Sequence, residues 1–290
     1  MHPAPSVIVF TVLSGAGFGF LACLAVGLLP VAGWPAFFIW GFGYALAVIG
    51  LLASTFHLGN PQRALLAFTQ WRSSWLSREG WASVLALLVL APMALSDWLG
   101  LGWPRAIGWV AAALCIATVL CTSMIYAQLK TVPRWNHWST PATFFAFAAA
   151  AGGILAAPGW AAALLCLILG ATLIYGWKRG DGAFAARAQT LGTATGLDRL
   201  GRPEVFEPAH TAGNYLMREM IHVVGRRHAQ KLRAIALVLA VALPALLVLV
   251  PLPGFRALAL ALHIAGAFAA RWLFFAEAEH VVGLYYGQRG

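Results

Sequence analysis

The segment Ser6–Leu29, SVIVFTVLSGAGFGFLACLAVGLL, decides the fold class, because it runs for 24 residues without a charged side chain. About 20 predominantly apolar residues cross the hydrocarbon core as a helix, which satisfies its own backbone polar groups there. Seven more segments of this kind follow: Phe37–Phe56, Ala82–Trp98, Ile107–Gln128, Thr140–Ala156, Trp160–Trp177, Ala234–Val250 and Ala257–Ala276. We therefore predict an all-α polytopic membrane protein, with a single domain over residues 1–290 built as a bundle of eight transmembrane helices.

The composition excludes a soluble globular protein, since 61% of the residues are hydrophobic, 10% are charged and the mean hydropathy is +0.79. No nucleotide-binding or zinc-protease motif occurs. The four cysteines lie in predicted spans and none forms a Cys-x-x-Cys pair, so this chain alone is not expected to build an iron–sulfur cluster or zinc site. Haem needs two histidines at comparable depth, and only His263 lies well inside a span. We expect no haem or metal in this chain.

The basic residues predict the orientation in the membrane. With eight spans, both termini and the even-numbered connections share one face, and sixteen of the 19 Lys and Arg residues lie on it. The opposite face holds Arg105 and Arg256, while Arg271 lies within the last span. By the positive-inside rule we expect a multi-pass protein of a bacterial inner membrane, with both termini cytoplasmic. This topology explains the net charge of +10 without nucleic acid, and the same charge suits docking of an acidic partner.

One connection, Lys178–Arg233, is long enough to form a sizeable cytoplasmic loop. Its first half is rich in Gly, Ala and Thr and is expected to be irregular. Residues Asn214–His228 have the periodicity of an amphipathic helix. Such a helix either lies on the membrane surface or contacts a soluble subunit, and both interpretations stay open.

Polar residues gather at the cytoplasmic ends of particular helices, first between the second and third spans. The second span runs into His57, and Pro61 is expected to end or bend the helix. The connection then carries Arg63 and reaches Ser77-Arg78-Glu79 at the start of the third helix. The serine and glutamate of that run suit an N-terminal cap, and a functional role is an equal alternative. Two arginines, a histidine and a glutamate in one short connection favour a site.

The fourth span ends in a second polar group. Tyr126 and Lys130 are four residues apart, which predicts that they share one helix face. Trp135 follows in the next connection. Snorkelling of Lys130 to the interface and anchoring of Trp135 there are the structural alternatives to a binding role.

The eighth span holds two ionisable residues at membrane depth. Arg271 is a functional candidate by default, because a charge inside the membrane must face protein, water or a partner. It is six residues from Glu277 and on a different helix face, so we expect it to meet another helix or a lipid headgroup instead. His263 is expected to be packed and hydrogen-bonded.

A lipid-soluble quinone fits apolar helices that carry a polar cluster at one face and no redox centre. Its two carbonyl groups need hydrogen-bond donors, its reduction takes up two protons, and it arrives through the bilayer. Histidine, tyrosine, lysine and arginine at helix ends supply donors, and histidine or glutamate relays protons. The electrons must then come from another subunit, so this chain would be an anchor and a quinone pocket.

The same residues resemble the DmsC-type membrane anchor subunit of dimethyl sulfoxide reductase and its relatives, with similar hydropathy across nearly the whole length. The similarity lies in four stretches, and together these most resemble the anchors of the sulfite-oxidising branch. They are the opening His2-Pro3, His57-Leu-Gly-Asn-Pro-Gln-Arg63-Ala with Ser77-Arg78-Glu79, Ser123-Met-Ile-Tyr126 with Lys130, Pro133 and Trp135, and Arg271-Trp-Leu-Phe-Phe-Ala-Glu277 with His280 and Tyr285-Tyr286.

The resemblance implies a complex of three subunits. A catalytic subunit would carry a molybdenum bis-pterin and an iron–sulfur cluster, and a ferredoxin-like subunit with four clusters would dock on the cytoplasmic face. The chain itself would not act on the substrate but would exchange electrons with ubiquinone or menaquinone. By this resemblance His57 binds quinone and Glu79 lies near the pocket. The full set of expected quinone-binding residues is His57, Arg63, Arg78, Glu79, Tyr126, Lys130, Trp135 and Arg271.

In the sulfite version, the complex oxidises sulfite to sulfate and reduces quinone. A quinol-oxidising reductase of dimethyl sulfoxide or related S- and N-oxides would use an anchor of the same shape. A secondary transporter is the alternative from another class, but the charges gather at one face instead of the midplane. A purely structural anchor, with quinone bound elsewhere, is the last alternative.

Overall fold

The computed structural model describes residues 3–56, 60–204, 206–207, 228–252 and 254–286. Eight of its helical segments are long and apolar enough to cross a membrane, and no strand occurs in the described ranges. This confirms the predicted fold class. The segments are α1 (Pro5–Ala25), α2 (Gly33–Thr55), α3 (Trp75–Leu99), α4 (Ala106–Ala127), α5 (Ser139–Ala156), α6 (Gly159–Ala186), α9 to α10 (Ala229–Leu247) and α11 (Phe255–Ala276).

Two helices are longer at the charged end than the sequence predicted. The third helix α3 begins at Trp75 instead of Ala82, and α6 continues past Trp177 to Ala186. Hydropathy marks only the stretch in the hydrocarbon core, whereas a helix continues into the interface with polar residues on it.

The predicted long loop Lys178–Arg233 is not confirmed, because helices occupy both of its ends. Helix α6 occupies its start, α9 (Ala229–Leu237) occupies its end, and the short helix α7 (Leu191–Thr195) lies between them. The expected amphipathic helix falls on residues 208–227, which lie outside the described part of the chain.

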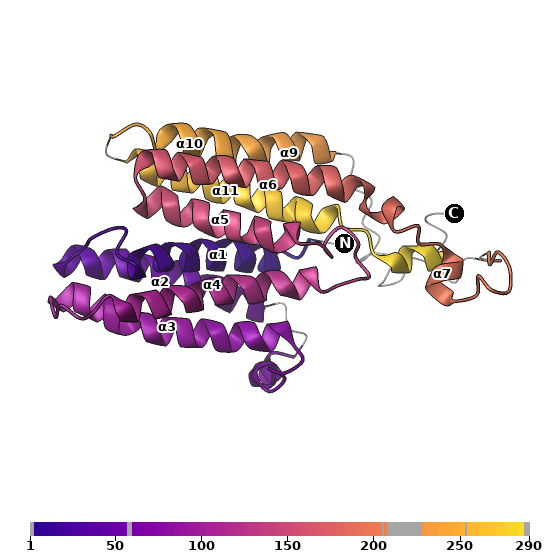
Figure 1. The fold of residues 1–290 in the computed structure, drawn as a ribbon, viewed down its shortest axis with the longest axis horizontal. Coiled ribbons are helices and arrows are strands. Elements are labelled where there is room, and N and C mark those ends of the chain that lie inside the picture. The colour runs from indigo at the N-terminus through magenta and orange to yellow at the C-terminus, as the bar shows by residue number, and fades with distance from the viewer. Residues whose placement is uncertain (1–2, 57–59, 205, 208–227, 253, 287–290) are drawn as a thin grey trace.

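The helices form two groups of four. Figure 1 shows α1 to α4 in its lower half and α5, α6, α9–α10 and α11 in its upper half. The two groups join where α1 packs against α5 and α11 and where α4 packs against α5. The connections after α2, α4 and α6 all follow the right-hand ends of their helices in Figure 1, and η4 (Val281–Tyr286) follows the right-hand end of α11. We call this the charged end, because it carries most of the basic residues predicted to share one face.

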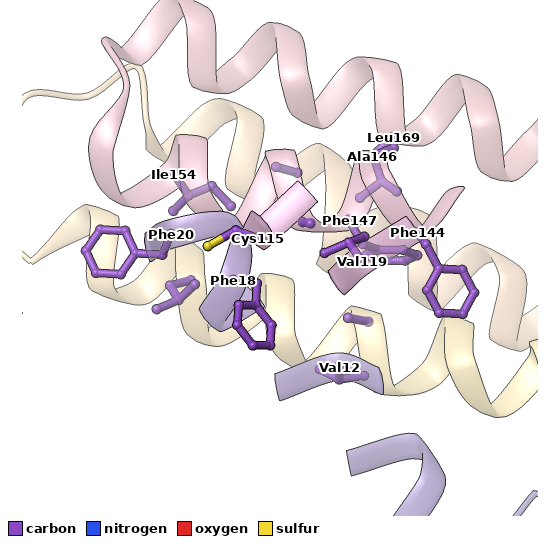
Figure 2. Close-up of a cluster of buried hydrophobic side chains, with 14 of the residues drawn as sticks. Val12, Phe18, Phe20, Cys115, Val119, Phe144, Ala146, Phe147, Ile154 and Leu169 are labelled. Atoms are coloured by element: carbon purple, nitrogen blue, oxygen red, sulfur yellow. The ribbon is translucent and has the colours of Figure 1, made fainter. Parts of the chain in front are cut away.

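Aromatic and small side chains fill the seam between the two groups. Figure 2 shows side chains of α1, α4 and α5 meeting there, among them Phe18, Phe20, Cys115, Val119, Phe144 and Phe147. Small residues bring the backbones together: a Cβ atom added to Gly19 would strike the backbone of Ala148, and one added to Gly152 would strike Gly19. Close approach at small residues is how membrane helices pack without a hydrophobic driving force.

His263 hydrogen-bonds to a backbone carbonyl of the seventh span that lacks its helical donor. Proline at position 244 has no N–H, so the carbonyl of Ala240 loses its helical donor, and a π-helical segment (Val238–Ala242) forms there. The Nδ1 atom of His263 lies 2.9 Å from this carbonyl oxygen, and the ring is 1% exposed. The prediction that His263 is packed and hydrogen-bonded is confirmed.

Candidate functional site

Glu79 lies buried between α3 and α4 at the charged end. Its side chain is 3% exposed, and the hydroxyl of Thr122 donates to its Oε1 atom at 2.6 Å. The expected N-terminal cap is wrong, because α3 begins at Trp75 and places Ser77 and Glu79 inside the helix. The hydroxyl of Ser77 instead donates to the carbonyl of Ala67 in the 3₁₀ helix η1 (Pro61–Phe68). Glu79 thus points into the protein with a hydroxyl as its partner.

Tyr126 lies on α4, one turn nearer the charged end than Thr122, and aromatic rings enclose it. The ring of Phe144 stacks on it at 5.7 Å between centroids, and the edges of Phe274 and Trp135 meet it at 5.4 Å each. Trp135 is 2% exposed and donates from Nε1 to the carbonyl of Phe274 at 2.9 Å. The connection between α4 and α5 therefore folds back over Tyr126, held by its tryptophan.

Arg271 of α11 is buried at the same place, with an exposure of 2%. Its guanidinium carbon lies 3.6 Å from the ring centroid of Phe144 and 5.0 Å from that of Phe147. The described residues include no carboxylate within ion-pair distance of it and no hydrogen-bond acceptor for it. The prediction that Arg271 meets another helix is confirmed, because both phenylalanines belong to α5.

Glu79, Tyr126 and Arg271 form one constellation across the seam between the two helix groups. Thr122, which bonds to Glu79, is one turn before Tyr126 on α4, and Phe144 contacts both the ring of Tyr126 and the guanidinium group of Arg271. The three residues come from α3, α4 and α11. Phe144 of α5 lies between the ring of Tyr126 and the guanidinium group of Arg271. A buried acid, a buried phenol and a buried cation thus lie together at the charged end, among aromatic faces.

The structure leaves two other predicted site residues exposed and a third half-buried outside the constellation. The prediction that Tyr126 and Lys130 share one helix face is wrong, because α4 ends at Ala127 and Lys130 lies exposed in the following turn. Arg63 is exposed in η1. Arg78 turns outward, stacks on the ring of Trp75 at 4.4 Å and donates to the carbonyl groups of residues 71 and 72. His57 lies outside the described residues.

A cluster of four charged residues at the charged end was not expected from the sequence. Arg134 and Arg233 each contact both Asp181 and Glu277, at distances between 2.6 and 3.3 Å. These side chains come from the α4–α5 connection, α6, α9 and the end of α11. Arg134 and Glu277 are 143 residues apart, so no local spacing reveals them. The prediction that Glu277 does not pair with Arg271 is confirmed.

Thr122 was also missed, although the sequence carries a signal for it. Thr118, Thr122 and Tyr126 are spaced by four residues, which places them in a polar stripe along α4. The stripe faces the interior, because these residues are 1%, 5% and 8% exposed. Within the described ranges, no group of three His, Cys, Asp or Glu residues could hold a metal ion.

The family of DMSO reductase anchor subunits (DmsC) matches residues 1–169 of the chain. The chain belongs to this family of membrane anchor subunits. It is 32% identical to a subunit of the sulfite dehydrogenase of Allochromatium vinosum, over an alignment of 324 positions that covers 99% of each protein. No solved structure matches the chain significantly. The matched region of the family includes Glu79, Thr122, Tyr126 and Trp135, while Arg271 lies beyond it.

Proposed function

We propose that this chain is the membrane anchor and quinone-reactive subunit of a molybdenum and iron–sulfur oxidoreductase of three subunits that oxidises sulfite to sulfate. The observation that carries the proposal is the buried constellation of Glu79, Tyr126 and Arg271 at the charged end of a DmsC-family bundle. The similarity to a sulfite dehydrogenase subunit supports the substrate of the complex.

The constellation fits a quinone head group in its chemistry. A quinone, when bound, accepts two electrons and two protons, and each carbonyl oxygen becomes a hydroxyl group. The phenol of Tyr126 and the guanidinium of Arg271 are hydrogen-bond donors for such oxygens. The aromatic side chains around Tyr126 provide apolar surroundings that suit a flat ring. The electrons would come from an iron–sulfur cluster of the partner subunit.

Each residue of the constellation has a separate role in this proposal. Glu79 holds and releases a proton beside the hydroxyl of Thr122, as a general acid or base does. Tyr126 donates to one carbonyl oxygen and fixes the ring between aromatic faces. Arg271 opposes negative charge that develops on the ring, among buried aromatic side chains where such an interaction is stronger than in bulk water. For His57 the family resemblance supports a hydrogen bond to the second carbonyl.

The charged end is the proposed docking face for the ferredoxin-like subunit and lies in the cytoplasm of a bacterium. The positive-inside rule supports this orientation, because basic residues at the opposite end are few and locally engaged. Arg105 pairs with Asp97 at 2.8 Å, and Arg256 donates to the carbonyl groups of Ile154 and Ala157. A partner at the charged end would bring its cluster close to the constellation.

The reverse direction is the second candidate function. The family description names a DMSO reductase anchor subunit, and such a complex would oxidise quinol and reduce an S- or N-oxide. The same donors and the same acid would serve that reaction, with Glu79 accepting a proton instead of delivering it.

Affinity capture of the chain from its native membrane, in mild detergent, tests the proposal. We expect two larger soluble subunits, molybdenum and iron to be captured with it, and the complex to reduce a ubiquinone or menaquinone analogue with sulfite. Reduction of dimethyl sulfoxide with quinol, without sulfite oxidation, would support the second function. A metal-free chain captured alone would contradict both and favour a transporter.

A further inference from the structure

A polar pocket lies between α5, α6 and α11 on the side of Arg271 that faces the charged end. Its volume is about 50 Å³. Arg134, Thr143, Gly176 and Trp177 of its lining are half-buried, so the pocket is open on their side. Arg271 is buried at its inner limit. We call this the α5–α6–α11 pocket; its other polar lining residues are Ser139, Thr140 and Glu277.

The pocket has the size and the polar partners that ordered water needs. A water molecule requires roughly 10–15 Å³ of such space and two to four polar partners, so the pocket has room for several. Thr140 and Thr143 donate their hydroxyl protons to the carbonyl groups of Trp135 and Ser139, at 2.8 Å each. Their oxygen atoms can therefore accept from water, while water accepts from Arg271. Water in this pocket would solvate a cation whose burial is otherwise very costly.

Glu277 does not take over this task, although it lines the same pocket. It is held by Arg134 and Arg233, which also hold Asp181, so two arginines and two carboxylates balance one another. The charge of Arg271 stays uncompensated by any described carboxylate. Water that enters the pocket from the charged end would serve as an acceptor for its guanidinium group.

The α5–α6–α11 pocket does not continue past Arg271 into the membrane-spanning part of the bundle. A second pocket on the inner side of Arg271 shares that residue and Phe147 with the first but measures about 10 Å³, enough for one water molecule at most. Its one histidine, His263, is already bonded to the carbonyl of Ala240. A fixed positive charge beside a constriction also opposes the passage of protons, as arginine does in water-selective pores.

We propose that the α5–α6–α11 pocket is a water-filled proton inlet, open to the charged end and closed at Arg271, that supplies the protons of quinone reduction. The inference rests on the proposed function for its purpose, but not for its hydration. Two protons from the aqueous phase at the charged end pass along the water to a quinone held beside Arg271, the residue of the constellation that lines the pocket. There they form the two O–H bonds of quinol, while the two electrons come from the partner's cluster. Arg271 restricts this uptake to one side of the membrane.

Hydrogen exchange at introduced thiols tests the inlet directly, with D₂O as the probe. The four native cysteines are replaced by alanine in the intact complex, and single cysteines are introduced as Thr143→Cys, Ala267→Cys or Ala150→Cys. Thr143 lines the inlet and Ala267 lines the second pocket, whereas Ala150 is 0% exposed on α5 and lines neither. Conversion of S–H to S–D is followed by the shift of the S–H stretching band in the infrared spectrum.

We expect the thiol at position 143 to exchange about tenfold or more faster than those at 267 and 150, because exchange requires contact with water. Equal rates at 143 and 150 would overturn the inlet. A thiol at 267 as fast as that at 143 would overturn its closure at Arg271. Neither outcome depends on quinone turnover, so failure of the inlet is distinguishable from failure of the proposed function.

A substitution of similar shape tests the purpose of the inlet. Thr143→Val removes one hydroxyl from the pocket, and we expect slower quinone reduction by sulfite with a larger solvent isotope effect in D₂O. Thr172→Val is the matched control, since Thr172 lies on α6, bonds to the carbonyl of Leu169 and is not in the lining. Equal isotope effects in both variants, with fast exchange at position 143, would show a hydrated pocket that carries no protons and would overturn the proposal.

Discussion

Two buried glutamates lie at the charged end, one in each group of four helices, and their surroundings differ. Glu79 is 3% exposed and receives a hydrogen bond from the hydroxyl of Thr122, whereas Glu277 is 5% exposed and lies between Arg134 and Arg233. A carboxylate between two guanidinium groups takes part in strong, charge-assisted hydrogen bonds that fix structure. A carboxyl group beside a hydroxyl can exchange its proton. Burial of an acid alone therefore does not identify a site; the set of partners does.

The same contrast runs through the two helix groups. In the first group the polar stripe of α4 leads to Glu79 and Tyr126 with few ion pairs, and its one described pair, Asp97 with Arg105, lies at the opposite end. In the second group the cluster around Glu277 joins α6, α9, α11 and the α4–α5 connection. The connection it holds carries Trp135, which covers Tyr126. The second group thus supports a site that the first group mostly builds.

Removal of the Glu277 carboxylate has the largest expected effect on stability. Glu277→Gln leaves Arg134 and Arg233 with one shared carboxylate, and breaking a buried ion pair in this way costs about 3 kcal/mol. We expect a clear decrease in the Tm of the detergent-solubilised complex. Glu204→Gln, at an exposed glutamate, is the control and should leave the Tm unchanged. An unchanged Tm in Glu277→Gln would show that the cluster is not structural.

Loss of one donor from the constellation has a smaller effect, and it falls on turnover. Tyr126→Phe keeps the aromatic enclosure and removes the hydroxyl, so a hydrogen bond of about 1 kcal/mol is lost and quinone reduction should fall roughly fivefold. Sulfite oxidation with a soluble electron acceptor should not change, because that reaction bypasses the membrane subunit. Equal losses with both acceptors would place Tyr126 outside the quinone site.

The smallest expected effect is the pH dependence of stability that His137 contributes at the start of α5. Its Nδ1 atom accepts a hydrogen bond from the amide of Ser139 at 3.2 Å. Burial, followed by the positive charge of Arg179, lowers the pKa of His137 below its usual value. The unfolded chain then binds this proton more readily, so the contribution to stability is complete above about pH 6.5 and decreases as the pH falls below it.

Thermal unfolding of the complex between pH 7 and pH 5 checks this dependence. His137→Asn retains an acceptor that does not titrate, and its Tm should fall slightly less over this range than that of the wild type. A steeper fall in the variant would reverse the assigned direction.

The sequence predicted the helices well and the site in part. The eight spans follow from hydropathy, because each must hide its backbone from lipid. The bounds of α3 and α6 do not, since polar residues such as Ser77 and Asp181 continue the helices beyond the apolar core. Glu79, Tyr126, Trp135 and Arg271, which we predicted to bind quinone, are all buried at the charged end, and their role stays a prediction.

What the sequence did not reveal depends on where the helices end and on how they pack. Lys130 was assigned to the face of Tyr126 on the assumption that α4 continues, but the helix ends at Ala127. Arg78 and Glu79 were both predicted to bind quinone. Their side chains point in different directions, as those of adjacent helix residues do, and the role of Arg78 stays a prediction. The cluster of Arg134 and Glu277 depends on tertiary packing across the whole chain, which one sequence does not reveal.

The comparison of the two glutamates is tested most directly by the ratio of two sulfite oxidation rates in the purified complex, one with a quinone analogue and one with a soluble electron acceptor. We expect Glu79→Gln to lower this ratio by about 100-fold or more, the range of general acid–base catalysis, with all subunits, molybdenum and iron retained. Any Glu277→Gln complex that stays assembled should keep the ratio of the wild type. An unchanged ratio in Glu79→Gln would contradict a proton-transfer role for Glu79 and, with it, the quinone site proposed around this residue.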